Sequence, residues 1–116
     1  MSKNFLSRNE ELRDGDYLLS NNGQYKAIFQ DDGNFVIYTW KPVWASNTDG
    51  SDAYRLCMQG DCNLVLYNGY GQPRWATNTD CFNCKVCHLQ LTDDGALVVQ
   101  KGAETVWSSE TSKGRK

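Results

Sequence analysis

The sequence predicts an all-β fold in which three small antiparallel sheets surround a common axis. Short stretches alternate polar and apolar residues, turns rich in Gly, Asn and Asp separate them, and one unit of about 30 residues occurs three times. No segment has a sustained helical period, although residues 9–14 could form one helical turn. A sheet of three or four strands cannot close a core alone, so we expect three sheets to face inward with pseudo-threefold symmetry.

Each unit contains a polar motif that is followed by a tryptophan segment. The motifs begin at residues 30, 59 and 92, which are 29 and 33 positions apart, and the three units tile residues 14–111 of a single 116-residue domain. We expect Trp44, Trp75 and Trp107 to meet near the common axis, where burial of each indole stabilises the fold by roughly 3 kcal/mol. The apolar residues that alternate with the motif positions are the expected core: Phe35, Ile37, Leu64, Leu66, Leu97 and Val99.

The motif has the form Gln-x-Asp-x-Asn-x-Val-x-Tyr and is complete in the first two units. Its residues are Gln30, Asp32, Asn34, Val36 and Tyr38, then Gln59, Asp61, Asn63, Val65 and Tyr67. A period of two predicts that the five side chains leave one strand on the same face. Amide, carboxylate and phenol groups around one aliphatic side chain suit a sugar. A polar strand face can also be merely solvated, but solvation alone would not repeat the same five residues in register.

The third unit keeps only Asp94 and Val98 of the motif. Thr92, Ala96 and Gln100 occupy the other three positions. Because alanine cannot donate to a hydroxyl group and glutamine lacks a ring, we expect this degenerate third site to be inactive and to serve as a wall of the fold.

Several functional classes are disfavoured by composition. The net charge of −2 offers no basic field for nucleic acid, and no apolar run approaches the roughly 20 residues of a membrane-inserting helix. Each motif supplies one carboxylate, whereas a glycosidase needs two, and His88 has no recognisable serine partner. We therefore expect a protein that is not an enzyme, needs no cofactor and holds no calcium.

The segments QDDGNFVIY at 30–38 and QGDCNLVLY at 59–67 resemble the mannose-binding motif of the bulb-type (monocot mannose-binding) lectins. The WASNT and WATNT segments and residues 12–30 are similar to that family too, so the resemblance covers nearly the whole chain. It implies a β-prism II fold of three four-stranded antiparallel sheets that binds mannose and mannose-rich glycans in defence or agglutination. In the family, Gln, Asp and Asn hydrogen-bond the 2- and 3-hydroxyls, the tyrosine reaches O4, and the valine packs against the ring.

Plant relatives often dimerise by exchanging C-terminal strands, so a homodimer is an open expectation. The alternative function is a β-prism module for protein–protein contacts with vestigial sugar binding. Two complete motifs favour the lectin.

The five cysteines leave their pairing partly open. The resemblance implies a Cys62–Cys87 disulfide, one repeat later than in plant relatives, where the cysteine stands at the position of Gly33. Either Cys81 or Cys84 could bridge to Cys57. A zinc site from Cys81, Cys84 and Cys87 with His88 is disfavoured because a second distant CxxC pair is absent, and we expect no metal.

Two features of the sequence give conflicting indications of the cellular compartment. Residues 1–12 contain no apolar core of a signal peptide, whereas the density of cysteines favours an oxidising compartment. Proteins of this type occur in fish skin mucus and similarly lack a visible signal. We expect secretion, with a cytoplasmic protein as the alternative.

Overall fold

The computed structural model describes residues 3–82, 84 and 86–112, which contain short strands and one short 3-10 helix. No helix in these ranges is long and apolar enough to cross a membrane. The elements are β1 (Phe5–Ser7), β2 (Glu11–Arg13), β3 (Tyr17–Leu19), β4 (Lys26–Phe29), β5 (Phe35–Tyr38), β6 (Pro42–Ala45), β7 (Ala53–Met58), β8 (Leu64–Asn68), β9 (Pro73–Ala76), β10 (Cys87–Leu91), β11 (Leu97–Lys101), β12 (Glu104–Ser108) and η1 (Ser109–Thr111).

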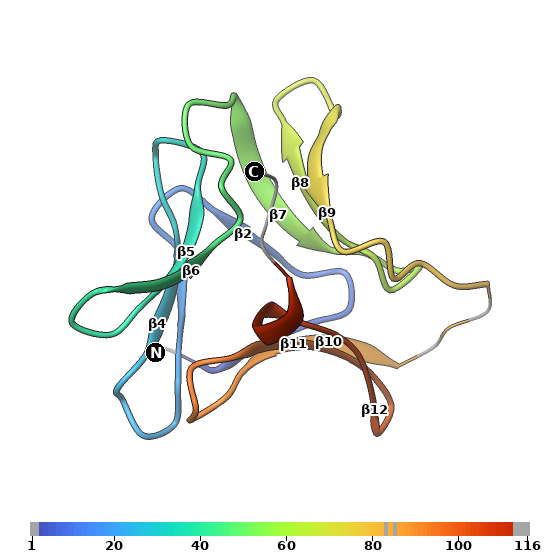
Figure 1. Ribbon diagram of the computed structural model, residues 1–116. Coiled ribbons are helices and arrows are strands. Elements are labelled where there is room, and N and C mark those ends of the chain that lie inside the picture. Colours follow the sequence, from blue (N-terminus) through green and yellow to red (C-terminus); the bar gives the residue numbers. More distant parts are fainter. Residues whose placement is uncertain (1–2, 83, 85, 113–116) are drawn as a thin grey trace.

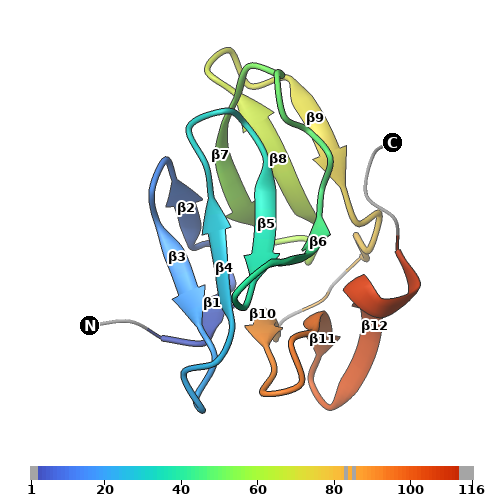
Figure 2. The same cartoon turned by 60° about the vertical axis from the view of Figure 1, so that its left-hand side comes forward.

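The strands form three antiparallel four-stranded sheets, as predicted. Their orders are β3-β4-β5-β6, β2-β7-β8-β9 and β1-β10-β11-β12. Figures 1 and 2 show the three sheets facing one another around a central axis. The fold is the β-prism II that the family resemblance implied.

The N-terminal segment supplies the fourth strand of every sheet. β1 pairs with β10 through Phe5 and Gln90, and β2 pairs with β7 through Glu11 and Cys57. Residues 9–14 therefore include a strand rather than a helical turn, because β2 buries only Leu12 and exposes its two neighbours. β1 and β2 thus join sheets whose other strands lie 40 or more residues later in the chain, since β2 ends at Arg13 and its partner β7 begins at Ala53.

The core has the composition expected from alternation. Two inward side chains on each of β5, β8 and β11 are fully buried, six in all: Phe35, Ile37, Leu64, Leu66, Leu97 and Val99. Trp44, Trp75 and Trp107 meet in edge-to-face contacts with ring centroids 5.7 to 5.9 Å apart, which confirms their expected place at the axis. The indole Nε1 of Trp44 donates to the carbonyl oxygen of Ser112 at 2.8 Å, so the end of the described chain folds back onto this cluster.

Two disulfides are present. Cys62 is bonded to Cys87, as the family resemblance implied, and Cys81 is bonded to Cys84. Cys57 does not pair with either of the latter, because it lies on the outer side of β7 opposite Val65, where it is buried as a free thiol. The sulfur atoms of Cys62, Cys81 and Cys84 lie within 4.8 Å of one another, and all three take part in the disulfides.

Candidate functional site

The motif bends around a hairpin instead of running along one strand. Gln30 follows β4, Asp32 lies in the turn, Asn34 precedes β5, and only the valine and tyrosine belong to that strand. The backbone N–H of Gln30 donates to the carbonyl of Asn34 at 2.9 Å, and Gly33 N–H donates to Gln30 O at 3.1 Å. The prediction of five side chains on one strand face was thus wrong in its geometry: the chain turns at Asp32, and the polar groups converge around the turn.

The turn requires a left-handed residue between the aspartate and the asparagine. Gly33 has a φ of +88°, and a Cβ placed there would lie 2.8 Å from the carbonyl oxygen of Ser51. In the second repeat Cys62 adopts the same conformation with a φ of +73°. A non-glycine residue rarely adopts this region, and here the disulfide to Cys87 anchors it.

The glutamine and tyrosine of each motif bond to each other. Gln30 Nε2 donates to Tyr38 Oη at 2.7 Å, and Gln59 makes the same bond with Tyr67. The phenol therefore accepts from the amide and keeps its own proton for another acceptor. Both polar side chains are half-buried on the outer side of the sheet.

The valine of each motif forms the floor of the site. Val36 and Val65 are only 3% exposed. They therefore offer a ligand little open surface.

The tryptophan segment orients the asparagine of each motif. Asn34 Oδ1 accepts from Ser46 Oγ at 3.2 Å and from the Thr48 backbone N–H at 3.1 Å. Asn63 Oδ1 accepts in the same way from Thr77 Oγ1 and Thr79 N, both at 3.2 Å. Since Oδ1 accepts both of these hydrogen bonds, the amino group of each asparagine points away from the tryptophan segment.

Four residues that orient the motif asparagines were not identified as functional from the sequence: Ser46, Thr48, Thr77 and Thr79. Their hydroxyls also fix the hairpin, because Thr48 Oγ1 donates to Gly33 O at 2.5 Å and Thr79 Oγ1 donates to Cys62 O at 2.7 Å. The signal that could have found them is the parallel spacing of hydroxyl residues in WASNT and WATNT. The middle asparagine of each segment, Asn47 or Asn78, has a φ of +58°, a conformation that asparagine tolerates better than most residues.

The aspartate of each motif is held by its own turn. Asp32 Oδ1 accepts from the Asn34 backbone N–H at 3.0 Å, and Asp61 Oδ1 accepts from Asn63 at 3.0 Å. The Gln, Asp, Asn and Tyr side chains of one complete motif together form a polar clamp. Each clamp leaves four groups without a partner among the described residues: the asparagine amino group, the tyrosine proton, the glutamine Oε1 and the second carboxylate oxygen. Two of these groups donate and two accept.

The third repeat uses its polar groups internally. Thr92 Oγ1 accepts from the backbone N–H of Ala96 at 3.1 Å, and Ala96 is 4% exposed. Gln100 Nε2 donates to Thr105 Oγ1 at 3.3 Å. Glu110 stands where the other repeats have a left-handed asparagine, and residues 109–111 form the 3-10 turn η1 instead. Asp94 and Val98 therefore lie in a repeat that has neither the motif asparagine nor the left-handed asparagine of the tryptophan segment.

The two complete sites differ in their surroundings. A groove of about 450 Å³ beside the second site is lined by residues that include Gln59, Tyr67, Arg55, Cys57 and Gly71. The guanidinium of Arg55 lies 5.2 Å from the Tyr67 ring centroid and its Nη1 lies 3.1 Å from Cys57 Sγ. Burial raises the pKa of the Cys57 thiol, and Arg55 partly opposes this shift.

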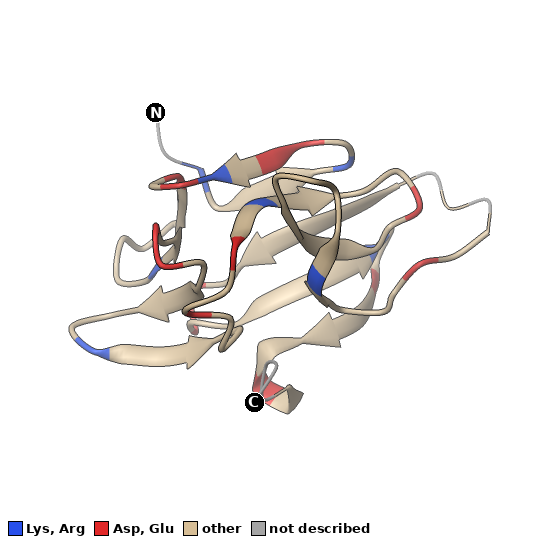
Figure 3. Ribbon diagram, turned by 90° about the horizontal axis from the view of Figure 1, so that it is seen from above, with Lys and Arg blue, Asp and Glu red and all other residues tan. Residues whose placement is uncertain are grey.

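At the first site the equivalent cation is directed elsewhere. Lys26 pairs with Tyr38 across the sheet, as Arg55 pairs with Tyr67, but its Nζ lies over the ring of Tyr17 at 4.3 Å. The neighbouring groove, also about 450 Å³, is lined by residues that include Gln30 and Asp32. Figure 3 shows acidic and basic residues dispersed over the described strands and loops rather than gathered on one face.

The family of the chain follows from its relatives. No family model matches the chain. The chain is 61% identical over 113 residues to the B-type lectin plumieribetin of Scorpaena plumieri, a match that covers 97% of this chain and 100% of that protein.

Two solved structures have the same fold. The monomeric monocot mannose-binding lectins of Gastrodia elata superpose with a TM-score of 0.84 and 34% identity, covering 94% of this chain and 98% of that one. The mannose-specific agglutinin of snowdrop (Galanthus nivalis) bulbs, solved with methyl-α-D-mannoside, superposes with a TM-score of 0.76 and 36% identity, covering 97% and 100%. The chain therefore belongs to the B-type lectins, the bulb-type family that its repeated motifs resemble.

Proposed function

We propose that this protein binds mannose through two sites, one at residues 30–38 and one at residues 59–67, without chemical change to the sugar. The observation that carries the proposal is the set of two donors and two acceptors left outward by each clamp. Every sugar hydroxyl both donates and accepts one or more hydrogen bonds, so such a set can pair with adjacent hydroxyls. The mannoside bound by the snowdrop agglutinin supports this assignment by relationship.

We infer a role for each side chain of the first site. The fixed Asn34 amino group donates to a hydroxyl whose proton the free oxygen of Asp32 accepts. Gln30 Oε1 accepts from a neighbouring hydroxyl, and the proton of Tyr38 is available to a further one. The axial 2-hydroxyl distinguishes mannose from its epimer at C2. That epimer would leave polar groups of the clamp without a hydrogen-bond partner.

The affinity of one site for one sugar is expected to be low. Four hydrogen bonds of roughly 0.5–1.5 kcal/mol each, less the cost of association, give a dissociation constant on the order of 1 mM. Two sites on different sheets of one chain allow cross-linking of glycans, and linkage of weak sites adds roughly 10² to 10⁴ in avidity. Agglutination in defence therefore does not require a homodimer.

The surroundings of the sites support a binding protein outside the cell. Each clamp offers one carboxylate, so the paired carboxylates of glycoside hydrolysis are not provided by the motif. Two disulfides within one small chain are typical of an oxidising compartment. We therefore propose a secreted lectin whose partners are mannose-rich glycans.

The test is retention on mannose-agarose by an Asn34→Asp/Asn63→Asp double variant. Aspartate keeps an oxygen that accepts from the tryptophan segment and replaces the amino donor with a second, negatively charged acceptor oxygen. Alanine would in addition leave the Thr48 N–H without its acceptor. We expect the wild-type chain to be retained and eluted by free mannose, the single variants to be retained weakly, and the double variant to flow through while keeping its melting temperature within a few degrees.

The control is Gln100→Glu, which adds a carboxylate to the degenerate face and should leave retention unchanged. Equal retention of the double variant and the wild type would refute the assigned sites.

A further inference from the structure

Two aromatic side chains are almost fully exposed just beyond the motif tyrosines. Tyr70 is 90% exposed in the loop between β8 and β9, three residues after Tyr67. Trp40 is 85% exposed between β5 and β6, two residues after Tyr38. The corresponding hairpin of the third repeat, between β11 and β12, consists of Gly102 and Ala103. An exposed aromatic side chain therefore accompanies each complete motif and is absent from the hairpin of the degenerate one.

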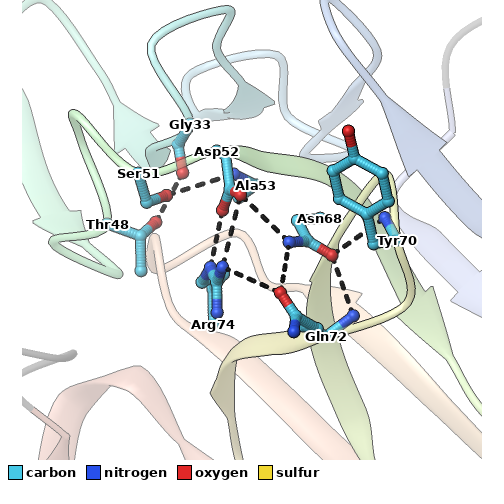
Figure 4. Close-up of polar contacts among 9 residues, drawn as sticks. All are labelled: Gly33, Thr48, Ser51, Asp52, Ala53, Asn68, Tyr70, Gln72 and Arg74. Carbon is cyan, nitrogen blue, oxygen red and sulfur yellow. Dashed lines mark hydrogen bonds and ion pairs between the residues drawn. The ribbon is translucent and has the colours of Figure 1, made fainter.

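A single exposed aromatic residue needs no functional explanation by itself, but the loop of Tyr70 is held in place by a buried asparagine. Asn68 is 1% exposed. Its Oδ1 accepts from the backbone N–H groups of Tyr70 at 3.0 Å and Gln72 at 2.8 Å. Its Nδ2 donates to Asp52 Oδ2 and to Gln72 Oε1, both at 3.0 Å (Figure 4). The side chain of Asn68 is thus fully used in fixing this loop.

An ion pair supports the same network from outside. Arg74 Nε donates to Asp52 Oδ1 at 2.6 Å, and its Nη2 donates to Asp52 Oδ2 at 3.2 Å and to Gln72 Oε1 at 3.3 Å. In Figure 4 the ring of Tyr70 is directed away from Arg74 and Gln72. The polar contacts therefore hold the loop backbone, while the aromatic ring remains open to solvent.

The loop also borders the second sugar site. Gly71, which follows Tyr70, lines the same groove as Gln59 and Tyr67 of the motif. A ligand held by the clamp can extend along this groove to the loop. One hexose is matched by the four polar groups of the clamp, so the chain segment that reaches the loop belongs to the next sugar of a glycan.

We propose that Tyr70 and Trp40 each bind the second hexose of a mannose oligosaccharide whose first hexose occupies the adjacent clamp. The proposal rests on the proposed function and deepens it by naming the ligand as an oligosaccharide rather than a single sugar. An aromatic ring presents an apolar face that packs against the C–H face of a pyranose, and such a contact needs no exact hydrogen-bond geometry. The two complete sites thereby prefer oligomannose to free mannose.

The experiment compares the affinities for methyl-α-D-mannoside and for a linear mannotriose in chains that retain one site. Asn34→Asp leaves only the second site, and Asn63→Asp leaves only the first. We expect each single-site chain to bind the mannotriose about three- to tenfold more tightly than the mannoside. Tyr70→Ala should abolish this difference in the Asn34→Asp chain and have no effect in the Asn63→Asp chain, whereas Trp40→Ala should do the reverse.

The matched control is Phe82→Ala, which removes an aromatic side chain that is 95% exposed and belongs to neither hairpin. It should leave both affinities unchanged in both backgrounds. If neither single-site chain binds the mannoside, the proposed function itself fails. If the mannoside binds but Tyr70→Ala and Trp40→Ala leave the preference for mannotriose intact, or Phe82→Ala removes it equally, the aromatic subsites are refuted and the clamps stand.

Discussion

The second and third repeats have the same sheet architecture but differ in the polar groups on their outer faces. Both bury two aliphatic side chains on their middle strand, Leu64 and Leu66 in one and Leu97 and Val99 in the other. Both place a tryptophan at the axis. Yet the second repeat directs a polar clamp outward, and the third bonds its Thr92 and Gln100 side chains within the repeat. The inward alternation therefore specifies the fold, and the outward residues can differ between repeats without a change of fold.

The first and third repeats show how small the structural difference is. Ser46 Oγ accepts from the Phe35 backbone N–H at 3.0 Å, and Ser109 Oγ accepts from the Leu97 backbone N–H at 2.9 Å. Only Ser46 also donates to an asparagine, because the third repeat has Ala96 at that position. The same hydroxyl is structural in one repeat and both structural and orienting in the other.

The largest expected effect is the creation of a third site. We predict that Thr92→Gln, Ala96→Asn and Gln100→Tyr together with Glu110→Asn raise the number of mannosides bound per chain from two to three, measured by nuclear magnetic resonance titration. The fourth substitution is needed because the 3-10 turn at residues 109–111 replaces the left-handed asparagine whose segment orients the motif in the other repeats.

The control for that prediction is the triple variant that keeps Glu110, which should still bind two. Three bound mannosides in the triple variant would show that the tryptophan segment is dispensable for orienting the asparagine.

The disulfide gives the next largest effect, and it acts on the second and third repeats alone. Cys62→Gly/Cys87→Ala should lower the free energy of unfolding by about 3 kcal/mol, because the bridge closes a loop with a sequence separation of 25 residues. Glycine is chosen because it adopts the left-handed turn as Gly33 does. Urea unfolding measures the change. Cys57→Ala removes a thiol outside both disulfides and should lower the free energy of unfolding by clearly less. An equal loss would show that the Cys62–Cys87 disulfide does not stabilise the fold by closing this loop.

A matched pair of serine variants separates folding from binding. Ser46→Ala and Ser109→Ala each remove one acceptor for a buried backbone N–H and should each lower stability by about 1 kcal/mol. Only Ser46→Ala should also weaken mannoside binding, by several-fold and at the first site alone. Thermal unfolding and titration of both variants test this, and a binding defect in Ser109→Ala would argue against the division between the repeats.

The smallest expected effect concerns the loop of Tyr70, whose counterpart in the third repeat is the two-residue connection Gly102-Ala103. Hydrogen bonds from Arg74 and Asn68 lower the pKa of Asp52 from 3.8 to about 2. A lowered pKa in the folded state means that this carboxylate contributes its stability above about pH 4 and loses it as the pH falls toward 2. The melting temperature of wild type should therefore exceed that of Asp52→Asn by a small margin at pH 6, and the margin should vanish near pH 2. A margin independent of pH would show that the ion pair does not contribute.

Much of the fold followed from the sequence because its signals are local. The alternation around Phe35 and Leu64 and the recurrence of Trp44, Trp75 and Trp107 specify three inward-facing sheets. The sharing of β1 and β2 among sheets was not predictable in this way, since the partners of Phe5 and Glu11 lie far along the chain and no local pattern names them.

The residues of the candidate site were visible in the sequence, but their arrangement was not. Spacing alone could not show that the chain turns at Asp32, because alternation looks the same across a tight hairpin as along a strand. The hydrogen bonds of Asn68 to the loop of Tyr70 could not be predicted either, because the residue type does not show whether an asparagine is buried or exposed. The Cys81–Cys84 pair also depended on where the connection folds, which places both residues away from Cys57.

The most direct test of the central claim is a titration of ¹⁵N-labelled protein with methyl-α-D-mannoside, followed by nuclear magnetic resonance. The side-chain amide signals of Asn34 and Asn63 should shift in a saturable way at millimolar ligand, while the backbone amide signals of Ala96 and Leu97 stay in place. Saturable shifts at Ala96 and Leu97, or unmoved side-chain signals of both asparagines at saturating ligand, would contradict the account.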